Sequence, residues 1–115
     1  MLTFPATIRV FVCAQATDMR RSFDGLSAMA TSVVLQDPLS GHLFVFRNKG
    51  GDRLKVLYWD RDGLCIWYKR LEKGTFELPA TTSPSVEISS TELSMLIDGI
   101  TLNAHRRKRF VLAHS

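Results

Sequence analysis

Three closely spaced runs of aromatic and β-branched residues, at 42–47, 53–59 and 64–71, constrain the fold of this chain more than any other feature. The spacers between them, at 48–52 and 60–63, contain Gly together with Asn or Asp, which are residues that close β-hairpins. Runs of this length and composition are typical of strands. The pattern therefore predicts an antiparallel β-meander in the middle of the chain.

The two faces of this meander follow from the residues that pair across its turns. We expect Arg47 to pair with Arg53 and Trp59 with Leu64, since these residues flank the two spacers. One face, the predicted core, then contains Phe44, Phe46, Leu54, Val56, Tyr58, Cys65 and Trp67. The opposite face contains Leu43, Val45, Leu57 and Ile66 at one end and Arg47, Arg53, Lys55, Tyr68 and Arg70 at the other. A slip of one residue in either turn would exchange residues between the faces.

The segments on either side of the meander predict further strands and two helices. Alternation at 7–13 favours a strand, and a short strand at 75–78 precedes a loop at 79–84. Apolar residues at helical spacing predict one helix of about four to five turns: Met19, Phe23, Leu26, Ala30 and Val33. Ser89 and Glu92 fit a capping box, which predicts a second helix over 90–98. The predicted fold is α+β: an antiparallel β-meander with one long helix packed on it and a second C-terminal helix.

Length and composition predict one domain rather than two. A chain of 115 residues with 45% hydrophobic residues can bury one modest core. We expect a single α+β domain over residues 1–102 and a flexible basic tail over 103–115. The apolar runs are shorter than the ~20 residues of a membrane span, and Pro5 and Arg9 interrupt the segment where a signal peptide would be apolar. We therefore expect a cytoplasmic protein without a membrane partner.

Positive charge is concentrated in two parts of the chain. The whole chain has a net charge of +4 and a pI near 9.4. Residues 42–73 contain eight basic and four acidic residues, residues 74–105 contain four acidic and no basic ones, and residues 106–109 add four basic ones. A basic meander and a basic tail on either side of an acidic segment favour an anionic partner such as nucleic acid.

Basic residues interleaved with aromatic ones in the meander predict a nucleic-acid-binding surface. Lys and Arg can hold phosphates while aromatic rings stack on bases. The candidate residues are Arg47, Lys49, Arg53, Lys55, Tyr68 and Arg70, together with Arg106, Arg107, Lys108 and Arg109 in the tail. The alternative interpretation is a solvated outer face of the sheet, where Lys and Arg discourage pairing between edges, followed by a solvated tail.

The acidic residues, histidines and cysteines do not form a recognisable catalytic or metal-binding motif. The carboxylates that most suggest a divalent metal are Asp18, Asp24, Asp60 and Asp62. A helix cap explains Asp18, however, and turn chemistry explains the Asp60–Gly63 segment. The histidines are scattered, and Cys13 and Cys65 lie in apolar runs typical of buried free thiols. We therefore assign no catalytic residue, metal ligand or cofactor.

Three blocks of the sequence resemble a known family. They are TDMRRSFDGL at 17–26, QDPLSGHLFVFRNKGGDRLKVLYWDRDGLCIWYKRLEKGTF at 36–76 and TELSMLIDGI at 91–100. In this order they are similar to the Orf2-like accessory proteins, also called TnpB, of bacterial insertion sequences of the IS66 family. The resemblance implies a role in DNA transposition beside a separate and larger transposase, and it carries over no catalytic residues.

Two functions follow from the resemblance and the residues together. The first is a DNA-binding helper in the transposition complex, with the transposase of the same element and insertion-sequence DNA as partners. The alternative is an interaction adaptor that docks on the transposase or self-associates without contacting DNA. It would use the acidic segment after residue 73 and the outward apolar residues Leu43, Val45, Leu57 and Ile66. A nuclease that uses the aspartates is the weakest hypothesis, so we expect no enzymatic activity. The sequence leaves a homo-oligomer open.

Overall fold

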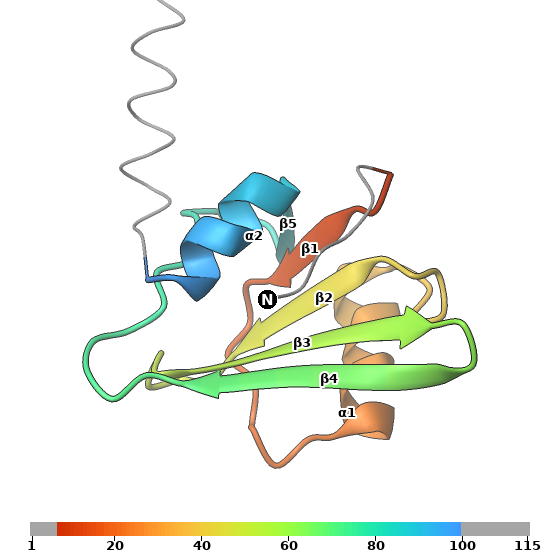
Figure 1. Ribbon diagram of the computed structural model, residues 1–115, viewed down its shortest axis with the longest axis horizontal. Coiled ribbons are helices and arrows are strands. Elements are labelled where there is room, and N and C mark those ends of the chain that lie inside the picture. The colour runs from red at the N-terminus through yellow and green to blue at the C-terminus, as the bar shows by residue number, and fades with distance from the viewer. Residues whose placement is uncertain (1–6, 100–115) are drawn as a thin grey trace, which may run out of the picture.

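The computed structural model describes residues 7–99, which form a mixed β-sheet with helices on both faces (Figure 1). The strands are β1 (Val10–Cys13), β2 (Leu43–Arg47), β3 (Arg53–Asp60), β4 (Gly63–Arg70) and β5 (Ser85–Ile88), in the spatial order β4-β3-β2-β1-β5. The helices are α1 (Phe23–Met29), which continues into the π-helical segment η1 (Ala30–Val34), and α2 (Ser90–Ile97). None of the helices within residues 7–99 is long and apolar enough to span a membrane.

The meander is present, but the predicted architecture around it is wrong. β2, β3 and β4 pair antiparallel as expected, yet they form only part of a five-stranded sheet. β1 pairs parallel with β2, and β5 pairs antiparallel with the other side of β1. Two parallel strands need a crossover connection, which α1 and η1 supply. The fold is α+β, with a mixed sheet and two short helices in place of a meander and one long helix.

The helix between β1 and β2 is shorter than its apolar spacing predicted. It begins at Phe23 and ends at Val34, so Met19 lies in the loop before it. Leu35 ends the helix in a left-handed conformation, with φ of 62°. Met19 nevertheless packs against the same core as the helix. The apolar spacing therefore combined a loop residue and a helix into one apparent stripe.

The second helix forms as its capping box predicted. The Ser89 hydroxyl accepts a hydrogen bond from the Glu92 backbone N–H at 3.0 Å, and the Glu92 carboxylate accepts one from the Ser89 N–H at 3.1 Å. At the other end of α2, Lys69 on β4 donates from Nζ to the Ile97 carbonyl at 3.0 Å. A cation there satisfies a helix-terminal carbonyl and interacts favourably with the helix dipole. Both ends of α2 are thus held by side chains.

Within the described residues, the segment 75–78 is not a strand, and β5 lies further along the chain. Phe76 in this segment is an anchor: its N–H donates to the Gly51 carbonyl at 2.7 Å, and its ring is fully buried. A short apolar run looks the same in sequence whether it forms a strand or places one ring in the core. The predicted loop at 79–84 leads directly into β5.

The first turn of the meander is longer than predicted, which changes the register. Arg47 pairs with Leu54 rather than with Arg53. The Asn48 side chain explains the difference, because its Oδ1 accepts a hydrogen bond from the Arg53 N–H at 3.0 Å and draws Arg53 into the turn closure. The second turn has the predicted register, with Trp59 opposite Leu64. Because of this one difference, the side chains of β2 lie on the opposite face from the predicted one, relative to those of β3 and β4.

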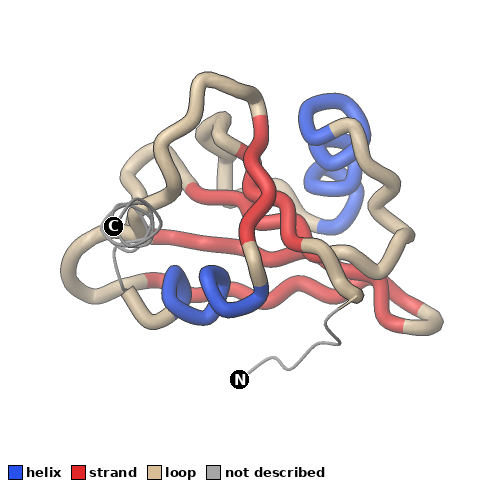
Figure 2. Tube along the Cα trace, turned by 90° about the horizontal axis from the view of Figure 1, so that it is seen from above, coloured by secondary structure: helices blue, strands red, loops and turns tan. Residues whose placement is uncertain are grey.

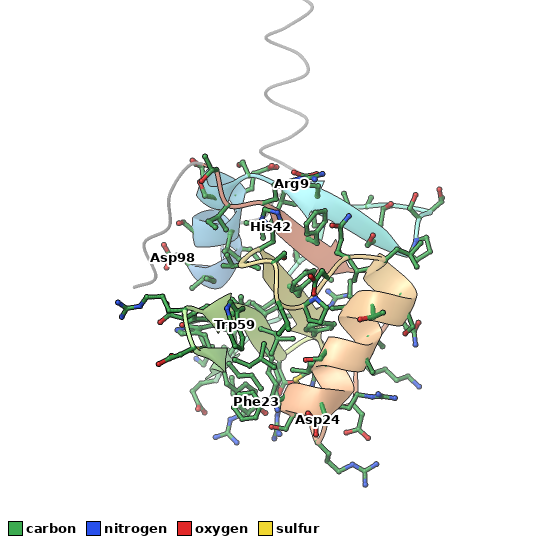
Figure 3. All side chains as sticks on the ribbon, turned by 90° about the vertical axis from the view of Figure 1, so that its right-hand side faces the viewer. Arg9, Phe23, Asp24, His42, Trp59 and Asp98 are labelled. Atoms are coloured by element: carbon green, nitrogen blue, oxygen red, sulfur yellow. The ribbon has the colours of Figure 1, made fainter. Side chains whose placement is uncertain are left out.

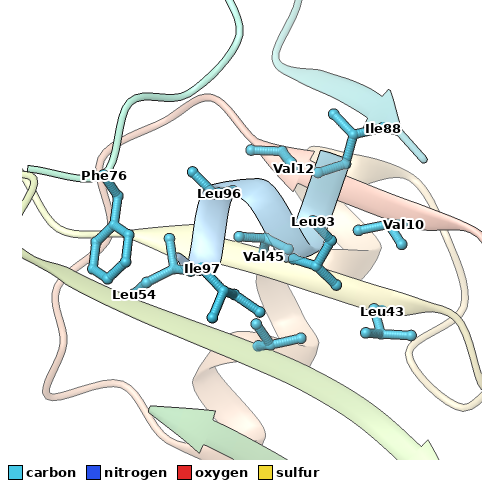
Figure 4. Packing of buried hydrophobic residues seen from close by; sticks show 11 residues of the cluster. Val10, Val12, Leu43, Val45, Leu54, Phe76, Ile88, Leu93, Leu96 and Ile97 are labelled. Atoms are coloured by element: carbon cyan, nitrogen blue, oxygen red, sulfur yellow. The ribbon is translucent and has the colours of Figure 1, made fainter. Parts of the chain in front are cut away.

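The helices lie on opposite faces of the sheet (Figure 2), and each face is buried in its own hydrophobic core. The core under α1 and η1 contains Phe11, Cys13, Leu26, Met29, Ala30, Val34, Phe44, Phe46 and Leu57. The core under α2 contains Val10, Val12, Leu43, Val45, Leu54, Val56, Phe76, Ile88, Leu93, Leu96 and Ile97 (Figure 4). A sheet that is covered on both faces explains why its central strands are apolar throughout instead of alternating.

The predicted outward apolar surface therefore does not exist. Leu43, Val45 and Leu57 are completely buried, and Ile66 is partly buried against the core under α1. The adaptor hypothesis therefore loses its apolar contact surface, and only the acidic segment after residue 73 still supports it. Cys13 is buried, Cys65 is partly buried, and both are free thiols as expected. Burial raises the pKa of the Cys13 thiol.

Candidate nucleic-acid interface

Two arginines and a tyrosine gather where β3 and β4 lie side by side, on the α1 face of the sheet. Arg53 pairs with Arg70 across the two strands, and the next pair on this face is Lys55 with Tyr68. Arg53 Nη1 donates to the Tyr68 hydroxyl at 3.3 Å. Like charges that face each other across strands are destabilising. An anion between Arg53 and Arg70 would relieve that repulsion.

Two open grooves meet at Arg53. One has a volume of about 470 Å³ and is lined by Arg53, Tyr68, Arg70 and Glu72. The other has a volume of about 460 Å³ and is lined by Ala16, Thr17, Asp18, Met19, Asn48, Lys49, Gly50 and Arg53. We call Lys49, Arg53, Tyr68 and Arg70 the Arg53 surface. An extended polyanion such as a nucleic-acid backbone fits such a surface better than a small molecule, which needs an enclosed pocket.

Three acidic groups lie beside the Arg53 surface, and two of them, Asp18 and Glu72, are paired with arginines. The third, Asp52, accepts a hydrogen bond from the Asn48 side chain at 2.8 Å, and this bond together with the charges of Arg53 and Arg70 lowers its pKa. The Arg70 Nη2 lies 3.6 Å from the Glu72 carboxylate. Asp18 is not a helix cap; its carboxylate accepts hydrogen bonds from the Arg20 backbone N–H at 2.9 Å and from the Arg20 guanidinium at 2.7 Å. These bonds lower the pKa of Asp18 to about 2. Within the described residues, Lys49 has no such acidic partner, and it is exposed.

Lys55 lies beneath the Arg53 surface rather than on it. Its side chain is buried, and its Nζ donates to the carbonyls of Met19 at 2.8 Å and Arg21 at 2.9 Å. The same Nζ lies 4.8 Å from the centre of the Tyr68 ring. These contacts hold the loop before α1 against the sheet and support the tyrosine. Lys55 therefore stabilises the fold, and its buried ammonium group is not available to bind a ligand.

Arg47 is also separated from the other candidates. It shares a face with Leu54, on the α2 side of the sheet, and its Nη1 donates to the Phe76 carbonyl at 2.6 Å. This bond ties the buried Phe76 segment to β2. The residues Arg106, Arg107, Lys108 and Arg109 lie outside the described residues, so their place relative to the Arg53 surface stays a prediction.

The loop before α1 adds a neighbour that sequence reasoning missed. The Arg21 carbonyl binds the Lys55 Nζ, which in turn lies over Tyr68, so the exposed Arg21 side chain starts close to the Arg53 surface. The two residues of this contact are 34 positions apart in the chain. The adjacent arginines of the loop were visible in the sequence, but no local signal placed them beside β4.

The aspartates do not converge on a catalytic centre. Within residues 7–99, no group of three or more His, Cys, Asp or Glu side chains could hold a metal ion. Asp24 lies in the first turn of α1, where an acidic group is favourable, and Figure 3 shows it well apart from the labelled Asp98. Asp60 lies beside Arg61 at 3.9 Å in the turn between β3 and β4. Each of these aspartates has a local structural explanation.

Comparison with known proteins gives a consistent result over most of the chain. The family model described as "IS66 Orf2 like protein" matches residues 8–107. Two relatives from Sinorhizobium fredii, both described as uncharacterized, are y4jC and y4hO. The first is 39% identical over 101 residues, which cover 88% of this chain and 86% of the relative. The second is 39% identical over 100 residues, which cover 87% of each. No solved structure matches the chain significantly.

Proposed function

The chain belongs to the IS66 Orf2-like family, and on this premise we propose that it binds DNA as an accessory protein of the transposition complex. Family membership supports an accessory role in the transposition of an insertion sequence. Orf2-like proteins are not a known catalytic family, which agrees with a division of labour in which a separate transposase performs the chemistry. DNA binding goes beyond what family membership supports, and it is the part of the function that we propose.

The observation that carries this proposal is the pairing of Arg53 with Arg70 beside an exposed tyrosine. Because Arg53 and Arg70 occupy paired positions on neighbouring strands, their guanidinium groups could hold one phosphate together. Tyr68 is 47% exposed, so one face of its ring is accessible to a sugar or a base. Lys49 extends the positive charge along the adjoining groove. Contacts of this type position a nucleic acid without selecting its sequence.

Fluorescence anisotropy tests the proposal directly. Labelled duplexes with the end sequence of the insertion sequence and with a scrambled sequence are titrated with the full chain at low and near-physiological salt. We expect binding that weakens steeply with salt, since each neutralised phosphate releases counterions. A preference for the end sequence that persists at higher salt would indicate recognition of the element. Absent binding at low salt would refute the proposal.

A matched pair of variants tests the site. Arg53→Ala is expected to weaken binding about threefold to tenfold and to reduce the salt dependence by about one phosphate contact. The control is Arg61→Asn, which removes an equal charge from an exposed turn of the same hairpin. Asn suits the left-handed backbone of Arg61, where φ is 51°. Equal losses from both variants would show that only net charge matters and would remove the Arg53 surface from the proposal.

The adaptor alternative is not proposed as a second function. Its predicted apolar contact surface is buried in the two cores. An association of the chain with the transposase would then depend on the acidic segment after residue 73 or on another surface. Co-purification of the two proteins without DNA, unaffected by Arg53→Ala, would be the observation that favours it over DNA binding.

A further inference from the structure

The two edges of the sheet differ in how well they are protected against pairing with another strand. β5 is an edge of four residues that follows Pro84, and its Glu87 carboxylate binds Arg9 at 2.6 Å. Short strands and charges are the usual means of blocking an edge. β4 is an edge of eight residues with no proline, and its centre, Leu64 to Tyr68, is uncharged. β4 is therefore the edge that is open to a partner.

The surroundings of β4 also resemble an interface more than a solvated edge. None of its residues is fully buried, whereas β3 beside it contains four buried residues. The start of α1 lies behind β4 in Figure 1, and its first residue, Phe23, is 44% exposed. Tyr68 on β4 itself is 47% exposed. Partly exposed aromatic residues beside a long edge are typical of protein interfaces.

The charges at the two ends of β4 indicate which partner fits. The strand follows a turn in which Asp60 and Asp62 flank Arg61, so this turn has a net charge of −1, and Arg61 lies 3.9 Å from Asp60. The strand ends in Lys69 and Arg70, and Arg70 lies 3.6 Å from Glu72 of the same chain. An antiparallel copy of the same strand would place the acidic end of one β4 beside the basic end of the other. A parallel copy would place like charges together. A two-fold axis makes each such contact occur twice, which is how symmetric dimers are built.

We propose that β4 pairs antiparallel with β4 of a second copy, so that one sheet continues through both chains. The charges favour a register centred on Ile66, with Asp62 opposite Arg70 and Leu64 opposite Tyr68 of the other copy. A two-fold axis perpendicular to the sheet keeps α1 of both chains on the same side. The two Arg53 surfaces would then face the same way. This inference does not depend on DNA binding. It uses the backbone edge of β4, and Ile66 is the one residue that this edge shares with the apolar set of the adaptor hypothesis.

The oligomeric state of the full chain without DNA is the first test. Sedimentation equilibrium over about 1–100 µM is expected to show a monomer–dimer equilibrium. Asp62→Lys and Arg70→Glu should each raise the dissociation constant about fivefold or more, because each replaces two attractive contacts of the dimer with repulsive ones. The double variant should recover wild-type association. Glu77→Lys, a charge reversal at an exposed residue outside β4, is the matched control.

A cross-link tests the register. Ile66→Cys in a Cys65→Ser background should form a disulfide-linked dimer on oxidation, because residues that face each other across strands lie about 5.5 Å apart, within the range of a disulfide. Ser85→Cys, at the other edge of the sheet, is made in a background that also contains Cys13→Ala, because Cys13 lies opposite Ser85 and could form a disulfide within one chain. This control should stay monomeric on a non-reducing gel. The charge variants at Asp62, Arg70 and Glu77 change exposed residues, so their results remain informative even if Ile66→Cys does not fold.

These experiments distinguish association through β4 from association through β5 and from a monomer. A monomer at every concentration would overturn the inference, as would a dimer that is indifferent to both single charge reversals. A dimer that cross-links through position 85 and not through position 66 would assign association to β5 and also overturn it. Failure of DNA binding would leave these results unchanged, because no experiment in this series contains DNA.

Discussion

The two faces of the sheet use their basic side chains in opposite ways. On the α2 face, the Arg47 guanidinium and the Lys69 ammonium group donate to backbone carbonyls of Phe76 and Ile97, and so they stabilise the fold. On the α1 face, Arg53 and Arg70 lie opposite each other beside open grooves. The number of basic residues in a meander therefore does not predict a binding surface. The groups that each basic side chain contacts decide whether it stabilises the fold or remains accessible to a ligand.

Lys55 lies at the boundary between these two uses. It belongs to the α1 face by its position in β3, but its ammonium group is buried under Tyr68 and bonded to two carbonyls. It therefore behaves like the basic residues of the α2 face. Variants of residues on each of the two faces test this difference.

The largest loss of stability is expected on the α2 face of the sheet. Phe76→Ala should lower the free energy of unfolding by about 3–5 kcal/mol, because a fully buried ring leaves a cavity beside Leu54 and Ile97. Urea denaturation followed by fluorescence or circular dichroism measures the change. Tyr68→Ala on the α1 face is the control. A similar loss of stability in this variant would contradict the difference between the two faces.

Lys55→Met should give the next largest effect, a loss of about 2–3 kcal/mol in the free energy of unfolding. The variant keeps most of the side-chain volume but leaves the carbonyls of Met19 and Arg21 without their donor. Urea denaturation measures it beside Arg53→Ala, which should change stability by less than about 0.5 kcal/mol. If Arg53→Ala were the more destabilising variant, the structural role of Lys55 would be wrong.

Ser89→Ala should cost about 1 kcal/mol, the usual contribution of an N-cap. It removes the acceptor for the Glu92 N–H and loosens the start of the helix that covers the α2 face. DNA affinity should not change, since no residue of α2 lines either groove at Arg53. Ser89→Asp, which retains an acceptor, should recover most of the stability. Loss of DNA affinity in a folded Ser89→Ala variant would show that the two faces are coupled.

Much of this fold could be predicted from local signals, but the candidate site could not. The turn between Trp59 and Leu64 and the capping box of α2 depend on neighbouring residues, and both predictions are confirmed. The first turn failed because the Asn48 side chain bonds to Arg53, a choice that spacing does not show. The pairing of β1 with β2 also depends on residues 33 positions apart, such as Val10 and Leu43.

The division of the basic residues into structural and accessible ones depends on even more distant contacts. Lys55 reaches Met19 across 36 positions, and Arg47 reaches Phe76 across 29. Sequence patterns of period two place both residues on a strand, but they do not identify the carbonyl that each one meets. The candidate surface therefore needed the three-dimensional structure, which reduced six predicted residues of the meander to Lys49, Arg53, Tyr68 and Arg70.

The smallest expected effect is a pH dependence at the loop beside the Arg53 surface. Hydrogen bonds from Arg20 lower the pKa of Asp18 to about 2, below the value of ~3.9 for an unfolded chain. A group with a lowered pKa contributes to stability above its unfolded value, and the contribution is lost as the pH falls toward 2. Titration of the Asp18 carboxyl by NMR should show the low value, and Arg20→Gln should move it upward. Because the ion pair is at the surface, with side chains that are 91% exposed for Arg20 and 44% exposed for Asp18, the free energy of unfolding should hardly change. An Asp18 pKa that is the same in both proteins would mean that the Arg20 contact does not persist in solution. Arg20 would then be as available to a phosphate as the arginines of the Arg53 surface.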